Sequence, residues 1–566
     1  MDVAVAPGER GGGTLRPLGG DRDGGGPPRR VADLPAALRE LESAEAPRWV
    51  WADTRAVYPA LLDAGVRLGR CHDLALTEAL LLGYAGRYGE PRSARAAYAR
   101  LHGLPVPPDE DPQPHRDEAS QAALFDPAAL GLAGDGGAAR RTAGTPAGDA
   151  ARPGPSELDL IAEVHADQMR RIAATAEPRR FRLLVAAESA AALAAAEMAH
   201  EGMPWRRDVH DALLTELLGP RPPHGGRPAR LQALAEEVSA AFGRPVNPDS
   251  PQQILKAFRA HGIELPSTRS QVLKQVDHPA VAPLLAYKEL ARLHNFHGWA
   301  WADQWVRGDR FHPEYVVGGV VSGRWATSGG GALQIPKALR RVVVADEGWT
   351  LVVADAAQLE PRVLAAISGD RGLARAAGET DLYAALARDF GGARESAKIA
   401  LLSAMYGGAS GDAVRLLAVL RKRFPQAYAY VEEAARAGEE GRLVRSWLGR
   451  TCPPPSRRWR ELVAGPDGAR AARERGRFTR NFVVQGTAAD WALTLLAVLR
   501  GLLPEPARLV FFQHDEVMVH CPRELAGEVC ALVERAAEQA TRLLFGDTPV
   551  RFPMRAVAVT CYADAK

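Results

Sequence analysis

The sequence predicts an α+β fold built from several domains. Short apolar runs at 351–354, 509–512 and 517–519 have the length and the bounding polar residues of β-strands. Longer stretches such as 186–218 repeat apolar residues at intervals of three and four, which predicts helices. A length of 566 residues allows about three or four domains. Contents of 46% hydrophobic and 25% charged residues are those of a globular protein.

The N-terminal region divides into two parts. Residues 1–30 are rich in Gly, Arg and Pro, and we expect them to be poorly ordered or loosely paired. From Val31 the pattern becomes globular: 37–44 predicts a helix, 47–53 a strand and 74–85 a second helix. Residues 105–156 are dominated by Pro, Gly, Asp and Ala with little periodicity, which predicts a flexible linker.

Helical patterning resumes at Leu158 and continues to about residue 293. Within it, 246–258 places capping residues and a proline ahead of an apolar face, as at the start of a helix. Lys256, Arg269 and Lys274 could bind phosphates there, and the alternative for each of them is an ordinary surface charge.

Residues 310–336 alternate like a sheet and then carry Gly323, Arg324 and a run of glycines. Glycine lets a backbone approach a ligand closely, so this segment is a candidate for contact with a partner molecule.

The predicted strand at 351–354 ends in Asp355. Gln358 and Glu360 follow as the chain turns into the helical pattern of 363–367. A carboxylate at the end of a buried strand is a candidate metal ligand.

A helical face carries Arg394, Lys398, Leu402 and Tyr406, which recur every four residues before Gly407 ends the pattern. Residues at this spacing lie on one side of a helix. An Arg and a Lys near a helix N-terminus suit a polyphosphate, and an aromatic ring suits a base. The alternative is a solvated basic face without a ligand.

The two C-terminal strands flank His514, Asp515 and Glu516, which form a tight acidic turn. Two adjacent carboxylates repel each other and lose solvation, so a cation such as Mg²⁺ would stabilise them. The alternative is a solvated hairpin tip. Together with Asp355, strand-end carboxylates from distant segments are what a two-metal site requires, which indicates phosphoryl or nucleotidyl transfer.

These segments resemble the motifs of DNA polymerase I, family A. The first motif of that family reads Asp-Tyr-Ser-Gln-Ile-Glu-Leu-Arg, and 355–362 reads Asp-Ala-Ala-Gln-Leu-Glu-Pro-Arg. The second has an Arg, a Lys four residues on, an aromatic residue and then Tyr-Gly, as 394–407 has with leucine in the aromatic place. The third is His-Asp-Glu, as in 514–516. The likeness covers about 181–566.

The resemblance implies a right-hand polymerase in the α+β class. A palm with an antiparallel sheet would span about 300–366 and 478–566, helical fingers about 367–477 and a helical thumb about 181–299, within a polymerase domain of 157–566. Its partners would be primer–template DNA and deoxynucleoside triphosphates, and its cofactor two Mg²⁺ ions held by Asp355 and Asp515.

The resemblance also assigns roles to single residues. Glu360 would block the 2′-hydroxyl of a ribonucleotide. The catalytic residues would be Asp355, Asp515, Glu516 and Lys398; the nucleotide-binding residues Arg394, Lys398, Leu402, Tyr406, Glu360, Gln358 and Tyr383; and the DNA-binding residues Arg324, Arg477, Asn481, Gln485 and His514.

Several positions depart from the family pattern. Ala356 and Ala357 replace Tyr-Ser, Leu402 replaces the aromatic residue that faces the incoming nucleotide, and Tyr383 stands where a phosphate-contacting His is usual. None of these changes removes a metal ligand. They put nucleotide selectivity and fidelity in question and leave the chemistry intact.

Residues 1–104 resemble a degenerate form of the small α/β proofreading exonuclease that precedes the polymerase in this family. Asp73 is a plausible nuclease carboxylate, but Arg55 stands where an acid is needed. We therefore expect no proofreading. Two alternative functions remain: a catalytically silent DNA-binding scaffold, and a polymerase that keeps 3′–5′ exonuclease activity.

Composition narrows the remaining possibilities. Lys plus Arg at 71 against Asp plus Glu at 68 leaves a net charge of +3, so any DNA contact depends on local arrangement of basic residues. Five cysteines without a CxxC pair argue against a zinc site and fit a reducing compartment. We find no apolar signal segment and expect a soluble, cytoplasmic monomer without membrane contact.

Overall fold

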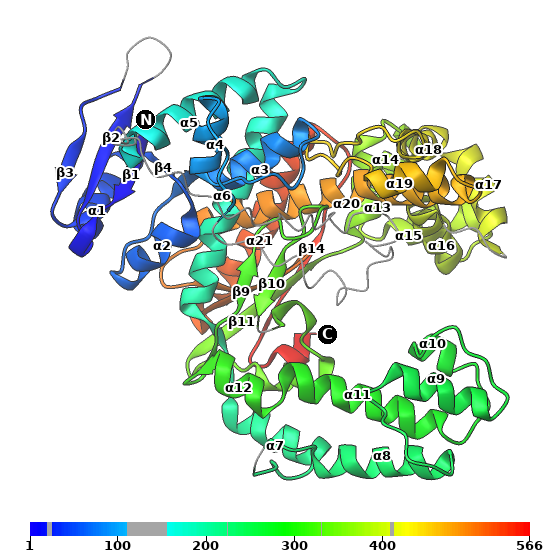
Figure 1. The fold of residues 1–566 in the computed structure, drawn as a ribbon. Helices are drawn as coiled ribbons and strands as arrows, with labels where there is room; N and C mark the ends of the chain where they lie inside the picture. Colours follow the sequence, from blue (N-terminus) through cyan, green and yellow to red (C-terminus); the bar gives the residue numbers. More distant parts are fainter. Residues whose placement is uncertain (20–24, 110–154, 224, 330, 408–411, 566) are drawn as a thin grey trace, which may run out of the picture. The chain divides into compact units, whose positions relative to one another are not determined.

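The computed structural model describes residues 1–19, 25–109, 155–223, 225–329, 331–407 and 412–565. It mixes helices with four sheets, which confirms the predicted α+β class. The chain divides into two compact units (Figure 1). The first comprises Met1–His200, Tyr315–Ser328 and Val352–Val557, and the second comprises Glu201–Glu314, Gly329–Leu351 and Ala558–Lys566.

The N-terminal part of the first unit is a five-stranded sheet in the order β3-β2-β1-β4-β5. β1, β2 and β3 pair antiparallel, whereas β1, β4 and β5 pair parallel. The strands are β1 (Asp2–Pro7), β2 (Gly13–Leu18), β3 (Arg29–Val31), β4 (Arg48–Trp51) and β5 (Arg70–Asp73). The helices of this region are α1 (Leu34–Glu45), α2 (Thr54–Asp63), α3 (Leu74–Tyr84), α4 (Ala94–Leu101), α5 (Glu157–Ala173) and α6 (Pro178–Glu201).

Both faces of this sheet are buried. Val3 and Val5 of β1 lie in one apolar core, and Ala4 and Ala6 lie in the other, as the alternation of a strand requires. The expectation that residues 1–30 are poorly ordered is therefore wrong for the described part of that segment. The Gly, Arg and Pro content of 1–30 masked the alternation of buried residues in 2–7. β1 also pairs with β4, which lies more than forty residues away along the chain.

The predicted helices and strand at 37–44, 47–53 and 74–85 are confirmed as α1, β4 and α3. Most of the predicted linker, 110–154, lies outside the described residues.

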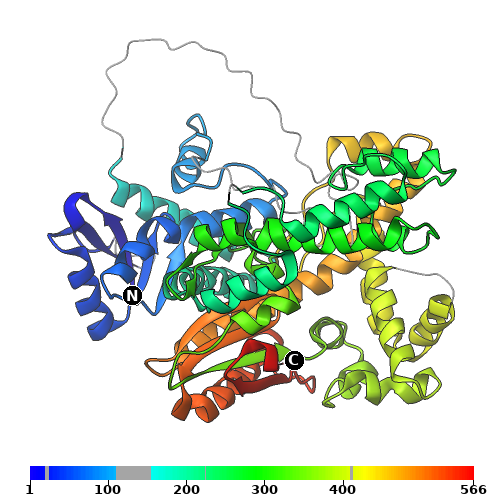
Figure 2. The same cartoon turned by 90° about the horizontal axis from the view of Figure 1, so that it is seen from below.

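Another sheet, most of whose residues belong to the first unit, has the order β12-β13-β11-β14. Its strands are β11 (Trp349–Ala356), β12 (Arg508–Gln513), β13 (Glu516–Pro522) and β14 (Met554–Val559). The long helix α20 (Gly468–Leu502) packs against α21 (Ala526–Phe545) and against α13 (Leu359–Ile367). α20 can be followed in Figures 1 and 2 as the orange helix between the golden helices and this sheet. The strands predicted around Asp355 and the acidic turn are confirmed.

A group of helices connects β11 to α20. It consists of α14 (Arg371–Ala376), α15 (Leu382–Leu386), α16 (Arg394–Tyr406), α17 (Asp412–Arg423), α18 (Pro425–Glu439) and α19 (Arg457–Val463). α16 begins and ends at the predicted residues, and Gly407 closes it with a positive φ of 69°.

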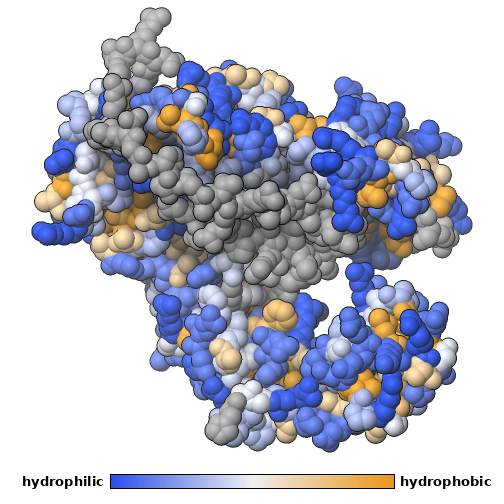
Figure 3. Space-filling view, in the orientation of Figure 1, coloured by the Kyte–Doolittle hydropathy of each residue, from blue (hydrophilic) through white to orange (hydrophobic). Residues whose placement is uncertain are grey.

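The second unit is mainly helical. Its helices are α7 (Arg207–Leu218), α8 (Ala229–Ala241), α9 (Pro251–Ala260), α10 (Ser270–Leu273), α11 (Val281–His297) and α12 (Trp299–Trp305). A small sheet joins β6 (Met203–Pro204), β7 (Val306–Arg307) and β8 (Arg310–Phe311). The predicted helix start near residue 250 is confirmed, because Ser250 caps α9. The face of α8 to α11 in Figure 3 is mostly hydrophilic with small hydrophobic patches.

The segment 310–336 is less regular than predicted. Its described residues hold the short strands β8, β9 (Glu314–Val316) and β10 (Ala326–Gly329), of which β9 pairs with β10, and turns join them.

Among the described residues, α6 and α20 are long and apolar enough to span a membrane by length and composition. The apolar windows of these helices are 67% and 83% buried inside the protein, as in core helices.

Candidate active site

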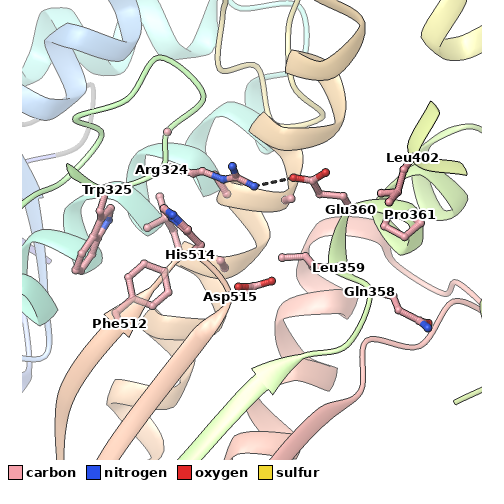
Figure 4. Close-up of a pocket in the computed structure, with 15 residues that line it drawn as sticks. Arg324, Trp325, Gln358, Leu359, Glu360, Pro361, Leu402, Phe512, His514 and Asp515 are labelled. Atoms are coloured by element: carbon pink, nitrogen blue, oxygen red, sulfur yellow. Dashed lines mark hydrogen bonds and ion pairs between the residues drawn. The ribbon is translucent and has the colours of Figure 1, made fainter. Parts of the chain in front are cut away.

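The sheet brings Asp355 and Asp515 together. β11 lies beside β13, and the backbone N–H of Ala356 donates to the carbonyl oxygen of Asp515 at 3.1 Å. In the hairpin, Gln513 pairs with Glu516, so His514 and Asp515 form a two-residue turn. His514 takes a φ of 59°, which is unusual for a residue with a side chain and indicates backbone strain at this turn. Figure 4 shows Asp515 at the floor of a pocket.

The electrostatics of this pair favour a bound cation. Burial, together with the nearby carboxylate of Asp355, raises the pKa of Asp515 to about 7, and Arg324 opposes that rise. A cation at the pair would remove the repulsion that raises this pKa. Within the described residues no group of three or more His, Cys, Asp or Glu side chains is arranged for a metal. The two aspartates therefore fit ions whose other ligands are phosphate oxygens and water, as Mg²⁺ prefers.

His514 and Glu516 flank Asp515; His514 is half-buried and Glu516 is buried. Glu516 is only 4% exposed. Burial and the neighbouring charge of Arg324 lower the pKa of His514 to about 4, so its ring is neutral at neutral pH. The Nδ1 atom of His514 is buried and has no hydrogen-bond partner among the described residues. It is thus available to a ligand that reaches the turn.

Glu360 is held by two partners from other segments. Nη2 of Arg324 donates to its Oε1 at 2.6 Å (Figure 4), and the hydroxyl of Tyr406 donates to its Oε2. Burial and the charge of Glu360 raise the pKa of Tyr406, which keeps the phenol protonated as a donor. The first and second sequence motifs and the glycine-rich segment therefore meet at one carboxylate.

A pocket of about 200 Å³ lies beside this carboxylate. Leu402, Pro361 and Phe512 contribute apolar walls, while Arg324, Glu360 and Asp515 contribute charge. A mostly apolar pocket with a few convergent polar groups is typical of a ligand site.

The basic residues of α16 lie on an accessible face. Nε of Arg394 donates to Oδ2 of Asp381 at 2.8 Å, and its guanidinium carbon lies 5.4 Å from the centre of the Tyr383 ring. Nζ of Lys398 lies 3.2 Å from Oε1 of Glu395. Both cations are partly exposed, so their remaining N–H donors are accessible to an anionic ligand.

Gln358 lines the same pocket, and its amide is held by partners inside the protein. Its side chain points away from Asp515 in Figure 4. Its Nε2 donates to Asp381 at 2.7 Å, and its Oε1 accepts from the backbone N–H of Leu382 and from Arg362. Gln358 takes a φ of 58°. Gln358 thus connects the start of α13 to the start of α15. Tyr383 is only 6% exposed.

The predicted DNA-binding residues of α20 occupy three different settings. Arg477 is exposed, whereas Asn481 is only 3% exposed and its Oδ1 has no partner among the described residues. Gln485 is half-buried and hydrogen-bonds the side chain of Tyr406. Arg477 and Gln485 are therefore accessible as the prediction requires, and Asn481 is not.

Sequence reasoning missed the groups that support the site. Trp325 packs edge-on against Phe512, with ring centres 4.7 Å apart, and both rings line the pocket. Arg450, which is 6% exposed, bridges Glu188 and Asp490. The apolar and aromatic residues around Trp325 and Phe512 could have indicated that these rings pack together. No local sequence pattern indicates the bridge that Arg450 forms.

The acids proposed for a nuclease are used inside the N-terminal sheet. Asp73 is 1% exposed; its Oδ2 accepts from the backbone and hydroxyl of Thr54 at 2.7 Å each, and its Oδ1 caps α3. Asp53 caps α2 and pairs with Arg55. The suggestion that Asp73 occupies a metal-ligand setting is wrong, because its oxygens are satisfied by the protein.

Residues 227–557 match the family model of DNA polymerase family A. The chain belongs to DNA polymerase family A. It is 29% identical over 356 residues to the thermostable DNA polymerase I of Thermus thermophilus, a match that covers 55% of this chain and 41% of that protein. It is 30% identical over 341 residues to DNA polymerase I of Chloroflexus aurantiacus, covering 52% of this chain and 35% of that protein. The chain thus aligns with less than half the length of these relatives.

A solved structure has the same fold. The POL domain of Pol1 from M. smegmatis, in a complex with DNA primer-template and dNTP, superposes with a TM-score of 0.69 at 19% identity and covers 100% of this chain and 95% of that chain. The right-hand polymerase fold is confirmed, and family A polymerases are metal-dependent. The finer boundaries of thumb, palm and fingers, and the exonuclease ancestry of 1–104, stay predictions.

Proposed function

We propose that this protein is a template-directed DNA polymerase that adds deoxynucleotides to the 3′ end of a primer, in DNA replication or repair. The observation that carries the proposal is the meeting of Asp355 and Asp515 at the end of two neighbouring strands, beside a pocket that Asp515 and Leu402 of α16 both line. Its substrates would be primer–template DNA and deoxynucleoside triphosphates. We further propose that it acts in the cytoplasm as a monomer.

Asp355 and Asp515 would hold two Mg²⁺ ions, which when bound supply the positive charge that activates the primer hydroxyl and neutralises the leaving pyrophosphate. Arg394 and Lys398 would bind the triphosphate through their exposed donors, since each is within reach of solvent on the same side of α16. Lys398 would also offer a proton and a charge to the leaving group. Glu516 would support the primer end.

The remaining residues would position the sugar, base and DNA. Glu360 would exclude a 2′-hydroxyl, which would meet a carboxylate whose oxygens already accept from Arg324 and Tyr406. Arg324, Arg477, Gln485 and His514 would contact the primer–template. The neutral ring of His514 and its open Nδ1 suit a hydrogen bond to the primer end. Tyr406 and Leu402 would face the base pair being formed. Tyr383, which is buried, and Gln358, which donates to Asp381, would support the nucleotide site from within the protein.

The test is primer extension with Mg²⁺ and all four deoxynucleotides. Wild type should extend the primer to the end of the template, and Asp515→Ala should bind the same DNA without extending it. A silent scaffold would bind DNA and extend nothing in either form. A polymerase that retains 3′–5′ exonuclease activity would, in addition, shorten the primer when nucleotides are omitted, and would still do so as Asp515→Ala.

A further inference from the structure

We propose that Asp381 is a positioning residue, which holds Arg394 with its terminal amino groups turned to the triphosphate and ties it to the segment that carries Asp355. The inference rests on the proposed function, because it concerns the same nucleotide site. No sequence motif pointed to Asp381, which lies in the turn between α14 and α15.

The carboxylate of Asp381 is fixed by four donors. Its Oδ1 accepts from the backbone N–H groups of Tyr383 at 3.0 Å and Ala384 at 3.1 Å, and from Nε2 of Gln358 at 2.7 Å. Its Oδ2 accepts from Nε of Arg394 at 2.8 Å. An aspartate held by the start of a helix in this way has little conformational freedom, so it fixes the position of the Arg394 side chain.

The hydrogen bond from Arg394 to Asp381 leaves most of the guanidinium donors for a ligand. A guanidinium carries five N–H donors, and only the one on Nε is used here. Across the described part of the chain, no acceptor takes the four donors on the two terminal nitrogens. The Tyr383 ring lies 5.4 Å from the guanidinium carbon and supports one side of it. The two terminal nitrogens of a guanidinium that is held through its Nε can donate side by side to two oxygens of a phosphate.

Asp381 also connects two parts of the site. Gln358, its third partner, precedes α13 and lies between Asp355 and Glu360 in sequence. The amide oxygen of Gln358 in turn accepts from the backbone N–H of Leu382 at 2.9 Å. One carboxylate therefore ties the start of α16 to the strand end that carries the catalytic aspartate. Such pre-organisation lowers the entropy lost when the nucleotide is bound.

The charge on Asp381 persists at every working pH. Burial alone would raise its pKa, but hydrogen bonds from Arg394 and Gln358 lower the pKa to about 2. Asparagine at this position keeps the shape and, through its amide oxygen, the helix cap; it removes the charge and puts an N–H donor where Oδ2 accepts from Arg394. This substitution therefore separates the hold on Arg394 from the stability of α15.

The experiment compares wild type, Asp381→Asn, Arg394→Met and the double variant. Dissociation constants are measured for a deoxynucleotide with the protein bound to a chain-terminated primer–template, and calorimetry with the protein alone uses inorganic tripolyphosphate as the probe. Asp370→Asn is the matched control, because Asp370 caps α14 through Leu373 and has no arginine partner in its described hydrogen bonds. Thermal unfolding of all variants reports on folding.

Asp381→Asn should weaken both ligands by about tenfold, which is the loss of one charge-assisted hydrogen bond. Its effect should vanish in the Arg394→Met background, since the residue acts through that arginine. Asp370→Asn should change only the unfolding temperature. Unchanged affinity in Asp381→Asn, or effects that multiply in the double variant, would overturn the proposal.

The same data separate this proposal from the proposed function. Primer extension by wild type without coupling between Asp381 and Arg394 contradicts the positioning role alone. Coupled tripolyphosphate binding without any primer extension contradicts the polymerase function alone. Absence of tripolyphosphate binding by wild type overturns the positioning role.

Discussion

Removal of the Arg450 guanidinium should destabilise the protein more than any change on its surface. Nε of Arg450 donates to Asp490 at 2.8 Å and Nη2 donates to Glu188 at 2.7 Å. The arginine side chain is 7% exposed, and the two carboxylates are 0% and 4% exposed. Arg450→Met therefore leaves two buried carboxylates without their cation.

The magnitude follows from the loss of a partner inside the protein. Removing one member of a buried ion pair costs about 3–5 kcal/mol, because the remaining charge stays desolvated. Burial already raises the pKa of Asp490, and loss of Arg450 removes a charge that opposes this rise. A carboxyl with a raised pKa favours folding below the unfolded pKa, and that stability is lost as pH rises through the folded pKa. The deficit should be largest at pH 7 and smaller at pH 5.

Arg450 also supports the loop before Arg324. Gly323 has a φ of 87°, and a Cβ atom there would lie 2.3 Å from Nε of Arg450. The loop backbone thus packs directly on the guanidinium, and Arg450→Met should loosen Arg324 as well as lower stability.

The assay is urea unfolding at pH 7 and pH 5, followed by fluorescence of the tryptophans. The matched control is Arg457→Met on α19, whose 2.9 Å pair with Glu461 is 85% and 63% exposed. Exposed pairs contribute little, so this variant should unfold like wild type. Equal midpoints for Arg450→Met and the control, or a deficit that grows at pH 5, would refute the reasoning.

Three further predictions concern selectivity, proofreading and acid stability. Glu360→Ala should raise ribonucleotide insertion relative to deoxyribonucleotide, whereas Glu360→Gln, of equal size, should keep most selectivity; single-nucleotide kinetics decide this, and unchanged selectivity in the alanine variant counts against the gate. A mismatched primer end incubated with Mg²⁺ and no nucleotides should stay intact, and shortening that persists in Asp515→Ala would disprove this. The pKa of His72 is lowered to about 4 by burial, so the unfolded chain binds the proton first and stability should fall by up to about 3 kcal/mol from pH 6.5 to pH 4. His72→Gln should flatten that slope, the exposed His102→Gln should not, and parallel slopes in all three proteins would contradict the assignment.

The parts of the fold that sequence predicted well are those with a local signal. The hairpin around Asp515 and the strand before Asp355 stand out because charge interrupts apolar runs of strand length. Helix α16 was bounded correctly because four-residue spacing and Gly407 define it within one segment.

The parts that sequence missed depend on distant partners. Strand β1 is recognisable only with β4 beside it, and Arg450 meets Glu188 across 262 positions of chain. Gln358 donates to Asp381, which lies 23 residues further along the chain, and no local pattern indicates this contact. For Asp73 the local sequence suggested a nuclease carboxylate, whereas in the structure this residue caps a helix.

The most direct test of the polymerase function is single-turnover insertion on four templates that differ only in the templating base. Wild type with Mg²⁺ should insert the complementary deoxynucleotide on each template. Asp355→Ala should bind the same primer–template with similar affinity, because few phosphate contacts are lost, and should insert no nucleotide on the same timescale. Insertion by Asp355→Ala at a rate near that of wild type, or insertion by wild type that ignores the templating base, would contradict the account.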